Sequence, residues 1–342
     1  MDRRVRNAVF QSTGAIVGAG FASGREIMRF FSRYGSLSWL GIALAASVMG
    51  LFSFFIMKKA RATGVISLSQ LCRAYLGPAG VVGTVAFTIL LGATGGSMTA
   101  AAGELGALAL PVQNAYWIML LASLALGILL SNKSLSPLAF VGKILVPALI
   151  LIFILCLIPP QGNAADSEST QPVFRKVAEV ILFGLSYGAL NITLSAGVLC
   201  EIGWGMPEKK AMRTSLYLSA CLLFLLSLGN FALLRQPQLK DAALPMVMLL
   251  NAFGKGGFWL AIIGLYLAVF TTLMAVARGL INIVGPCKPS WIGFVITGVV
   301  FFIFAVVGFD RLVGVIYPAL GFMCLLLLLW FITARQKKDS TT

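Results

Sequence analysis

The chain of 342 residues is 59% hydrophobic and 11% charged, whereas soluble domains contain about 45–50% apolar and about 25% charged residues. This composition excludes a water-soluble fold, because lipid must cover so much apolar surface. The net charge of +15 does not indicate nucleic-acid binding, because the basic residues stand in short clusters between apolar stretches. The sequence has no His and its six Cys form no CxxC pair, so we expect neither an enzyme nor a resident cofactor.

Ten hydrophobic segments follow one another along the chain, and each is near the roughly 20 residues that a membrane helix needs. They lie near 7–32, 38–58, 80–106, 112–131, 137–158, 174–203, 212–234, 256–284, 290–308 and 311–333. Residues 67–76 and 241–253 are short amphipathic stretches, which predict one helix on the inner surface and one helix over an outer entrance. The sequence therefore predicts an all-α integral membrane protein of about ten spans.

The distribution of basic residues predicts how these spans are oriented. With the N-terminus inside, basic clusters at 3–6, 58–61, 209–213 and 335–338 all lie in inside loops. Such loops carry the excess of Lys and Arg in membrane proteins. We therefore expect a multi-pass protein of the cell (inner) membrane with both termini in the cytoplasm and the lipid bilayer as its partner. The sequence does not indicate an oligomeric state.

A polar stretch, Pro159–Gln171, divides this single transmembrane domain into halves at 5–158 and 174–334. Each half has five spans, and because five is odd, the second half must be inverted relative to the first. Each half also opens with a glycine-rich span, at 14–24 and at 184–191. Interrupted helices at corresponding places in inverted halves are typical of secondary transporters that bind their substrate between the halves.

The first glycine-rich segment is Val17-Gly-Ala-Gly-Phe-Ala-Ser-Gly24. Each glycine lowers helix stability by about 1 kcal/mol, so the segment predicts a break whose free backbone groups bind a carboxylate or a cation. Close helix packing through GxxxG pairs is an open alternative. We expect Arg25 and Glu26, which follow the break, to neutralise each other and to form a gate. The candidate substrate-binding residues of this span are Val17, Gly18, Ala19, Gly20, Phe21, Ala22, Ser23 and Gly24.

Two further features lie in segments 6 and 8. Ser186, Tyr187, Gly188 and Asn191 give segment 6 polar groups for a substrate, although Ser and Asn also bond helix to helix. In segment 8 the adjacent hydroxyls of Thr271 and Thr272 are suitable ligands for Na⁺, although Thr in membrane helices often bonds its own backbone.

Lys143 lies inside segment 5. A charge within a span costs at least a few kcal/mol, which indicates a functional role. Snorkelling of the side chain to the cytoplasmic surface is the alternative.

The run Gly14-Ala-Ile-Val-Gly-Ala-Gly-Phe-Ala-Ser-Gly-Arg-Glu-Ile27, followed by Phe30-Phe31, resembles the first helix of the YkvI-type bacterial membrane proteins. These belong to the amino acid–polyamine–organocation superfamily with the LeuT-type five-plus-five fold. The resemblance implies that broken helices 1 and 6 cradle the substrate. It also implies one Na⁺ site made of the carbonyls of Gly14, Val17 and Ala268 and the hydroxyls of Thr271 and Thr272. Phe21 and Gly184 stand where a second Na⁺ site would need polar side chains, so we expect at most one Na⁺.

Lys143 leaves the coupling ion open. In sodium-independent relatives a Lys on helix 5 places its ammonium where this Na⁺ would lie. At a separation of 4 Å the two charges would repel by about 4 kcal/mol at an effective dielectric constant near 20. The threonines therefore favour Na⁺, and the lysine favours either H⁺ coupling or exchange in which its ammonium acts as a tethered cation.

The features together predict a secondary active transporter of a small organic, amino acid-like solute that works by alternating access. The alternative is a ligand-sensing membrane receptor that binds on the same fold without transport. An ion channel is disfavoured, because the sequence shows no repeated filter-like segment.

Overall fold

The computed structural model describes residues 2–65, 67–131, 136–158, 173–284 and 291–334; the side chains of Ala19 and of residues 136–143 lie outside this description. Throughout these ranges the regular structure is helical. Six of the described helices are long and apolar enough to cross a membrane, and three shorter ones are also apolar. The expectation of an all-α membrane protein is therefore confirmed.

Ten spans account for most of the described residues, five on each side of residues 159–172. The first is broken into α1 (Arg3–Ile16), α2 (Ala19–Ala22) and α3 (Arg25–Phe30) and is called helix 1 below. The sixth consists of α9 (Val173–Leu194) and α10 (Ala196–Trp204) and is called helix 6. The other spans are α4 (Ser38–Thr63), α6 (Gly80–Ala109), α7 (Ala115–Ser131), α8 (Ser136–Leu155), α11 (Glu208–Leu234), α13 (Gly254–Val284), α14 (Trp291–Val307) and α15 (Phe309–Arg311) continued by α16 (Tyr317–Thr333). The predicted linker Pro159–Gln171 lies outside the described residues.

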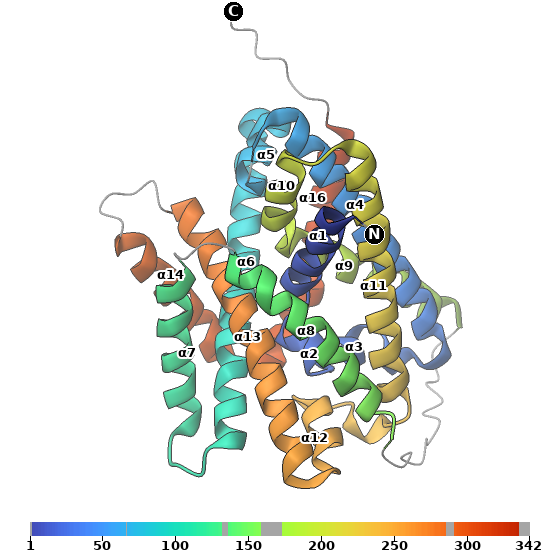
Figure 1. The fold of residues 1–342 in the computed structure, drawn as a ribbon, viewed down its shortest axis with the longest axis vertical. Coiled ribbons are helices and arrows are strands. Elements are labelled where there is room, and N and C mark those ends of the chain that lie inside the picture. Colours follow the sequence, from blue (N-terminus) through green and yellow to red (C-terminus); the bar gives the residue numbers. More distant parts are fainter. Residues whose placement is uncertain (1, 66, 132–135, 159–172, 285–290, 335–342) are drawn as a thin grey trace, which may run out of the picture.

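Helix 1 runs through the middle of the bundle (Figure 1), where it contacts α8, α11 and α13. The sequence predicts one break in this helix, and the structure has two within eight residues. Val17 ends α1 with an extended ψ of 97°. Gly24 precedes α3 with φ of 81°, a left-handed conformation that a residue with a Cβ adopts only with strain. The two breaks leave α2 as a single turn between two longer helical pieces.

Helix 6 differs from the prediction. Its α9 part continues without interruption through Gly184 and Gly188, and the helix breaks only at Ser195. A Cβ at Gly184 would lie 2.6 Å from the Gly41 carbonyl oxygen, and one at Gly188 would lie 2.8 Å from the Ala45 carbonyl oxygen. These glycines therefore let α9 pack closely against α4.

Two short helices lie at opposite ends of the bundle (Figure 1). One is α5 (Leu68–Leu76) and the other is α12 (Pro245–Asn251), and both fall where the amphipathic stretches predict them. The two ends are called the α5 side and the α12 side below. Near the α12 side, the tenth span begins with the short α15 and a π-helical turn, η4 (Leu312–Ile316), a local widening that is frequent at functional sites.

Candidate functional site

The break after α1 faces α13. The Thr272 hydroxyl lies 3.5 Å from the Val17 carbonyl oxygen, to which it donates a hydrogen bond. Gly18 allows this approach, because a Cβ there would lie 3.4 Å from the same hydroxyl. Two of the predicted Na⁺ ligands, one from each half of the chain, therefore meet at this junction.

Thr271 behaves differently from Thr272. Its hydroxyl donates within α13, to the carbonyl oxygens of Leu267 at 2.9 Å and Ala268 at 3.0 Å. Two predicted ligands, Thr271 and Ala268, are thus bonded to each other rather than across to helix 1. The oxygen atoms at this junction fit a hard cation in kind, and the freed Val17 carbonyl with the Thr272 hydroxyl is the part that spans two elements.

Glu26 lies behind the second break. Glu26 is only 4% exposed. The Tyr187 hydroxyl of α9 donates a hydrogen bond to Glu26 Oε2 at 3.0 Å. The carboxylate packs directly on α2, since a Cβ at Gly20 would overlap it. The rings of Phe30 and Phe31 lie against that of Tyr187, with centroids 4.9 Å and 5.0 Å away. Glu26 is therefore held inside the bundle by helix 6 rather than exposed as a gate.

Three more buried hydroxyls belong to the same neighbourhood. Tyr317 begins α16. Its hydroxyl group interacts with the carboxyl group of Glu26 and with the hydroxyls of Thr94 and Ser97 on α6. The hydroxyls of Thr94 and Ser97 lie next to that of Tyr317, and the three have no further hydrogen-bond partner among the described residues. Each hydroxyl can form more than one hydrogen bond, so this cluster is a place where a ligand or water can bind.

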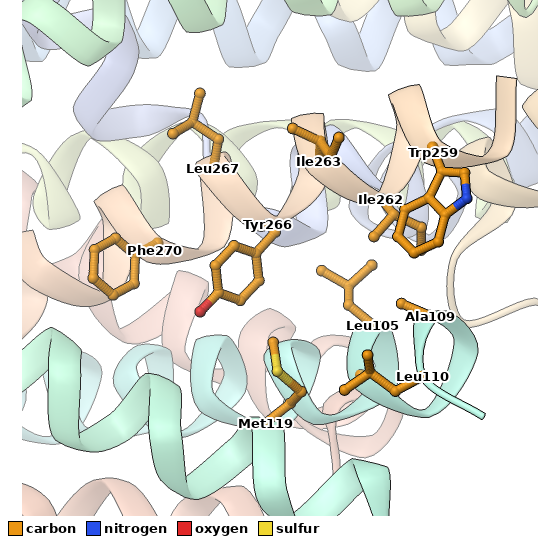
Figure 2. Close-up of a pocket in the computed structure, with 11 residues that line it drawn as sticks. Leu105, Ala109, Leu110, Met119, Trp259, Ile262, Ile263, Tyr266, Leu267 and Phe270 are labelled. Carbon is orange, nitrogen blue, oxygen red and sulfur yellow. The ribbon is translucent and has the colours of Figure 1, made fainter. Parts of the chain in front are cut away.

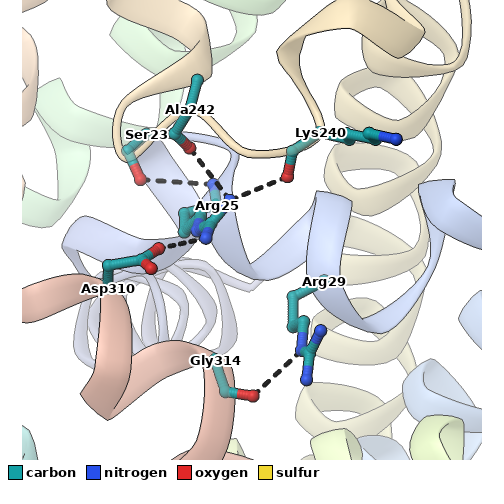
Figure 3. A network of polar contacts seen from close by, with 7 residues as sticks. All are labelled: Ser23, Arg25, Arg29, Lys240, Ala242, Asp310 and Gly314. Carbon is teal, nitrogen blue, oxygen red and sulfur yellow. Dashed lines mark hydrogen bonds and ion pairs between the residues drawn. The ribbon is translucent and has the colours of Figure 1, made fainter.

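Arg25 makes a latch on the α12 side (Figure 3). Its guanidinium donates to the carbonyl oxygens of Lys240 at 2.8 Å and Ala242 at 3.1 Å, and it forms an ion pair with Asp310 of α15. Next to it, the Met246 backbone N–H of α12 donates to the Ser23 carbonyl at 3.0 Å. Arg25 thus ties helix 1 to the α12 segment and to the tenth span, and its partner is Asp310 and not Glu26.

A cavity of about 420 Å³ lies on the α5 side. Its wall includes Ala15, two residues before the first break, and Val276, one turn after Thr272. Its polar lining residues are Ser67, Ser69, Gln70, Glu201, Arg278 and Asn282. The structure therefore combines a closed latch on the α12 side with a partly polar cavity that reaches the break from the α5 side.

A second cavity, of about 350 Å³, lies between α6, α7 and α13 (Figure 2) and has apolar walls. Its one side-chain hydroxyl, that of Tyr266, is bonded to Ser123 at 3.0 Å. Trp259 and Ile263, which line it, are 45% and 64% exposed on the outer surface. The walls of this cavity therefore offer a solute few polar groups.

Comparisons with known proteins show one sequence relative and several solved structures with a similar fold. No protein-family model matches it. It is 25% identical over 324 residues to the uncharacterized membrane protein YkvI of Bacillus subtilis (strain 168), which covers 92% of each chain. The manganese transporter of Eremococcus coleocola superposes with a TM-score of 0.60 at 12% identity, over 95% of this chain and 78% of the transporter. A Na⁺-coupled sialic acid symporter superposes with a TM-score of 0.59 at 12% identity, over 94% of this chain and 76% of the symporter.

The chain has a LeuT-type transporter fold. The expected resemblance to YkvI-type proteins is thereby confirmed, and the two solved structures are transporters and not enzymes. Within this LeuT-type fold, the residues of helix 1 from Val17 to Gly24 do lie at the junction of several spans, and Phe21, Ala22 and Ser23 are fully buried.

The predicted residues of helix 6 separate into two groups. Tyr187 faces helix 1 through Glu26, whereas Ser186 donates to the Pro318 carbonyl of α16 at 3.4 Å. Gly188 packs on α4, and the Asn191 side chain donates to the Tyr187 carbonyl at 3.0 Å. Lys143 lies in α8, but its side chain is outside the described residues, as is that of Ala19.

Four residues of this site do not follow from the sequence motifs. They are Thr94, Ser97, Tyr317 and Asp310. The only local signal was the small polar run Thr94-Gly-Gly-Ser97 in an otherwise apolar span. Asp310 stands near a span end, where acidic residues are common, so its pairing with Arg25 needed the tertiary structure.

Proposed function

We propose that the protein is a secondary active transporter of a small organic, amino acid-like solute, that it works by alternating access, and that Na⁺ or H⁺ drives it. The observation that carries this proposal is the asymmetry around helix 1. The same broken helix is latched by Arg25 on the α12 side and meets the 420 Å³ cavity on the α5 side. Broken helices at the contact of two five-span halves are where transporters of this kind bind substrate.

In this proposal the halves 5–158 and 174–334 are inverted repeats that rock about helix 1. The backbone groups of Val17–Gly24 and the side chain of Tyr187 bind the solute, and Arg25 acts as the gate on the α12 side. Basic clusters near Lys58 and Lys210 lie on the α5 side, where Lys58 pairs with Glu208 at 2.6 Å and Lys210 pairs with Asp2 at 2.7 Å. We assign the α5 side and both termini to the cytoplasm of the cell (inner) membrane on this ground.

Sodium is the coupling ion supported by Thr272. Na⁺ would be held by the carbonyls of Gly14, Val17 and Ala268 and by the hydroxyls of Thr271 and Thr272; a solved structure of the same fold is a Na⁺-coupled symporter, which supports Na⁺ as the coupling ion. Binding there would fix α1 against α13. A proton is the alternative, with Lys143 as the sequence-based candidate to carry it.

The test is uptake into proteoliposomes. Purified protein is reconstituted, and radiolabelled amino acids are supplied one at a time under a Na⁺ gradient, a pH gradient or neither. The proposal expects saturable accumulation of at least one solute that depends on one gradient. Saturable binding with no accumulation under either gradient would instead identify a ligand-sensing receptor. Unchanged uptake after Na⁺ is replaced by choline would exclude sodium coupling.

A further inference from the structure

We infer that Glu26 carries the coupling proton of the transport cycle: it is protonated in the conformation described here and ionised when helix 1 exposes it to water. This inference rests on the proposed transport function and names a proton carrier other than Lys143. It starts from a carboxyl group that is buried against a broken helix and that has a hydroxyl as its hydrogen-bond partner.

The surroundings of Glu26 are closed and apolar on most sides. The carboxylate lies on Gly20, and the ring that reaches it, Tyr187, is packed between Phe30 and Phe31. Glu26 lines neither of the two cavities described above. The tight contact with Gly20 leaves space for a proton on the carboxylate rather than for an organic cation.

The basic groups of α3 are engaged elsewhere. Arg25 bonds Lys240 and Ala242 and pairs with Asp310, and Arg29 donates to the Gly314 carbonyl at 2.9 Å (Figure 3). An ionised carboxylate that is buried without a cation loses several kcal/mol of hydration. Such groups generally take up a proton instead.

The neighbouring elements face Glu26 with hydroxyls and apolar groups. Helix α9 contributes Tyr187, α16 contributes Tyr317, and η4 has no ionisable residue in Leu312–Ile316. Helix α11 packs on α3 with Gly229 and Leu233. Arg33 of η1 (Ser32–Leu37) stacks on Tyr34 and Phe183, with its guanidinium carbon 4.8 Å and 5.8 Å from their ring centroids. Among the side chains that the structure describes, the environment therefore offers hydrogen bonds to a carboxylic acid and no charge to balance a carboxylate.

The buried cluster of three hydroxyls offers a way to link the proton and the solute. Thr94, Ser97 and Tyr317 are at most 1% exposed and have no partner outside their own cluster among the described residues. A bound solute would satisfy them and would draw Tyr187 or helix 1 away from Glu26. In each cycle a hydronium ion on one side gives up a proton, so that one O–H bond breaks on hydronium and one forms on the Glu26 carboxylate; on the other side the Glu26 O–H bond breaks and the proton passes to a water molecule, which becomes hydronium.

Infrared spectroscopy tests the protonation state without any substrate. Purified wild-type protein at neutral pH is expected to show the carbonyl stretch of a protonated carboxylic acid. Glu26→Gln should lose this band, and the matched control Glu208→Gln should keep it, because that carboxylate is half-exposed and paired with Lys58. A wild-type spectrum without the band, or an unchanged band in Glu26→Gln, would overturn the inference.

A second variant, Tyr187→Phe, tests the inference independently in case Glu26→Gln misfolds. Tyr187→Phe keeps the ring and removes the hydroxyl that donates to Oε2. The band should persist in this variant and move to higher frequency, because the carboxylic acid has lost a hydrogen bond. An unmoved band would assign the protonated group to another residue and would refute the inference.

Transport separates this inference from the proposed function. With a solute that wild-type protein accumulates under a pH gradient, Glu26→Gln should lose accumulation and keep solute counterflow, because exchange needs no proton release. Equal accumulation by Glu26→Gln and wild type would refute the role of Glu26 while leaving the transporter intact. If no solute is accumulated by the wild type, the proposed function fails, and the infrared result still decides whether Glu26 holds a proton.

Discussion

The Arg25 latch leads to a quantitative prediction. Arg25→Met removes two bonds from a charged donor to the Lys240 and Ala242 carbonyls and one ion pair to Asp310. Hydrogen bonds to charged groups contribute about 1.5–3 kcal/mol each when buried. The Asp310 side chain is 56% exposed, and pairs that exposed contribute about 1 kcal/mol or less. We take about 3 kcal/mol as a conservative total, which corresponds to a shift of about 100-fold toward the open latch.

The backbone amide of Met246 reports this opening directly, because it donates to the Ser23 carbonyl across the latch. Hydrogen–deuterium exchange of a peptide that covers α12 should therefore be about 100-fold faster in Arg25→Met than in wild type. The matched control Asp310→Asn removes only the exposed ion pair and should accelerate exchange by about fivefold or less. Equal acceleration by the two variants would refute the argument that the carbonyl contacts hold the latch.

Three further predictions concern the ion junction, the packing glycines and the N-terminus. Thr272→Val should weaken sodium-dependent thermal stabilisation more than Thr271→Val, because the Thr272 hydroxyl already reaches helix 1 whereas that of Thr271 must first leave its bonds within α13; equal effects would contradict this ranking of the two ligands. Gly203→Ala places a Cβ 2.6 Å from Met57 backbone atoms and should lower stability by about 1–3 kcal/mol, whereas Gly197→Ala meets open space and should not lower the unfolding temperature. A hydrogen bond from Lys210 lowers the pKa of Asp2, so the contact is fully present above the ordinary value of 3.8 and is lost as the pH falls through the lowered pKa; amide exchange at residues 4–6, corrected for its intrinsic pH dependence, should rise there in wild type and at all pH values in Asp2→Ala, which lacks the oxygen that accepts from the Arg4 N–H.

The sequence predicted the secondary structure correctly where the same feature, such as an apolar run, extended over many residues. The span boundaries follow from continuous apolar runs, since lipid forces each run of this length into a helix. The break in helix 1 followed from its closely spaced glycines, and the positions of α5 and α12 followed from short amphipathic stretches.

The same rules failed for helix 6. Glycines that interrupt helix 1 leave α9 intact at Gly184 and Gly188, because there the glycine surface is covered by the α4 backbone. A glycine in a membrane helix either weakens it or lets a neighbour approach, and the sequence does not say which neighbour is present. The break at Ser195 therefore appeared only in the structure.

The sequence by itself determined the membrane class, the ten spans and the unstable first helix, because hydrophobicity and glycine content act locally along the chain. Only the tertiary structure decided the partners of the charged residues. Arg25 and Glu26 are adjacent in sequence, yet Arg25 pairs with Asp310 and Glu26 accepts a hydrogen bond from Tyr187. Successive residues of a helix point in different directions. Which side chain meets which across the bundle depends on how all the spans pack.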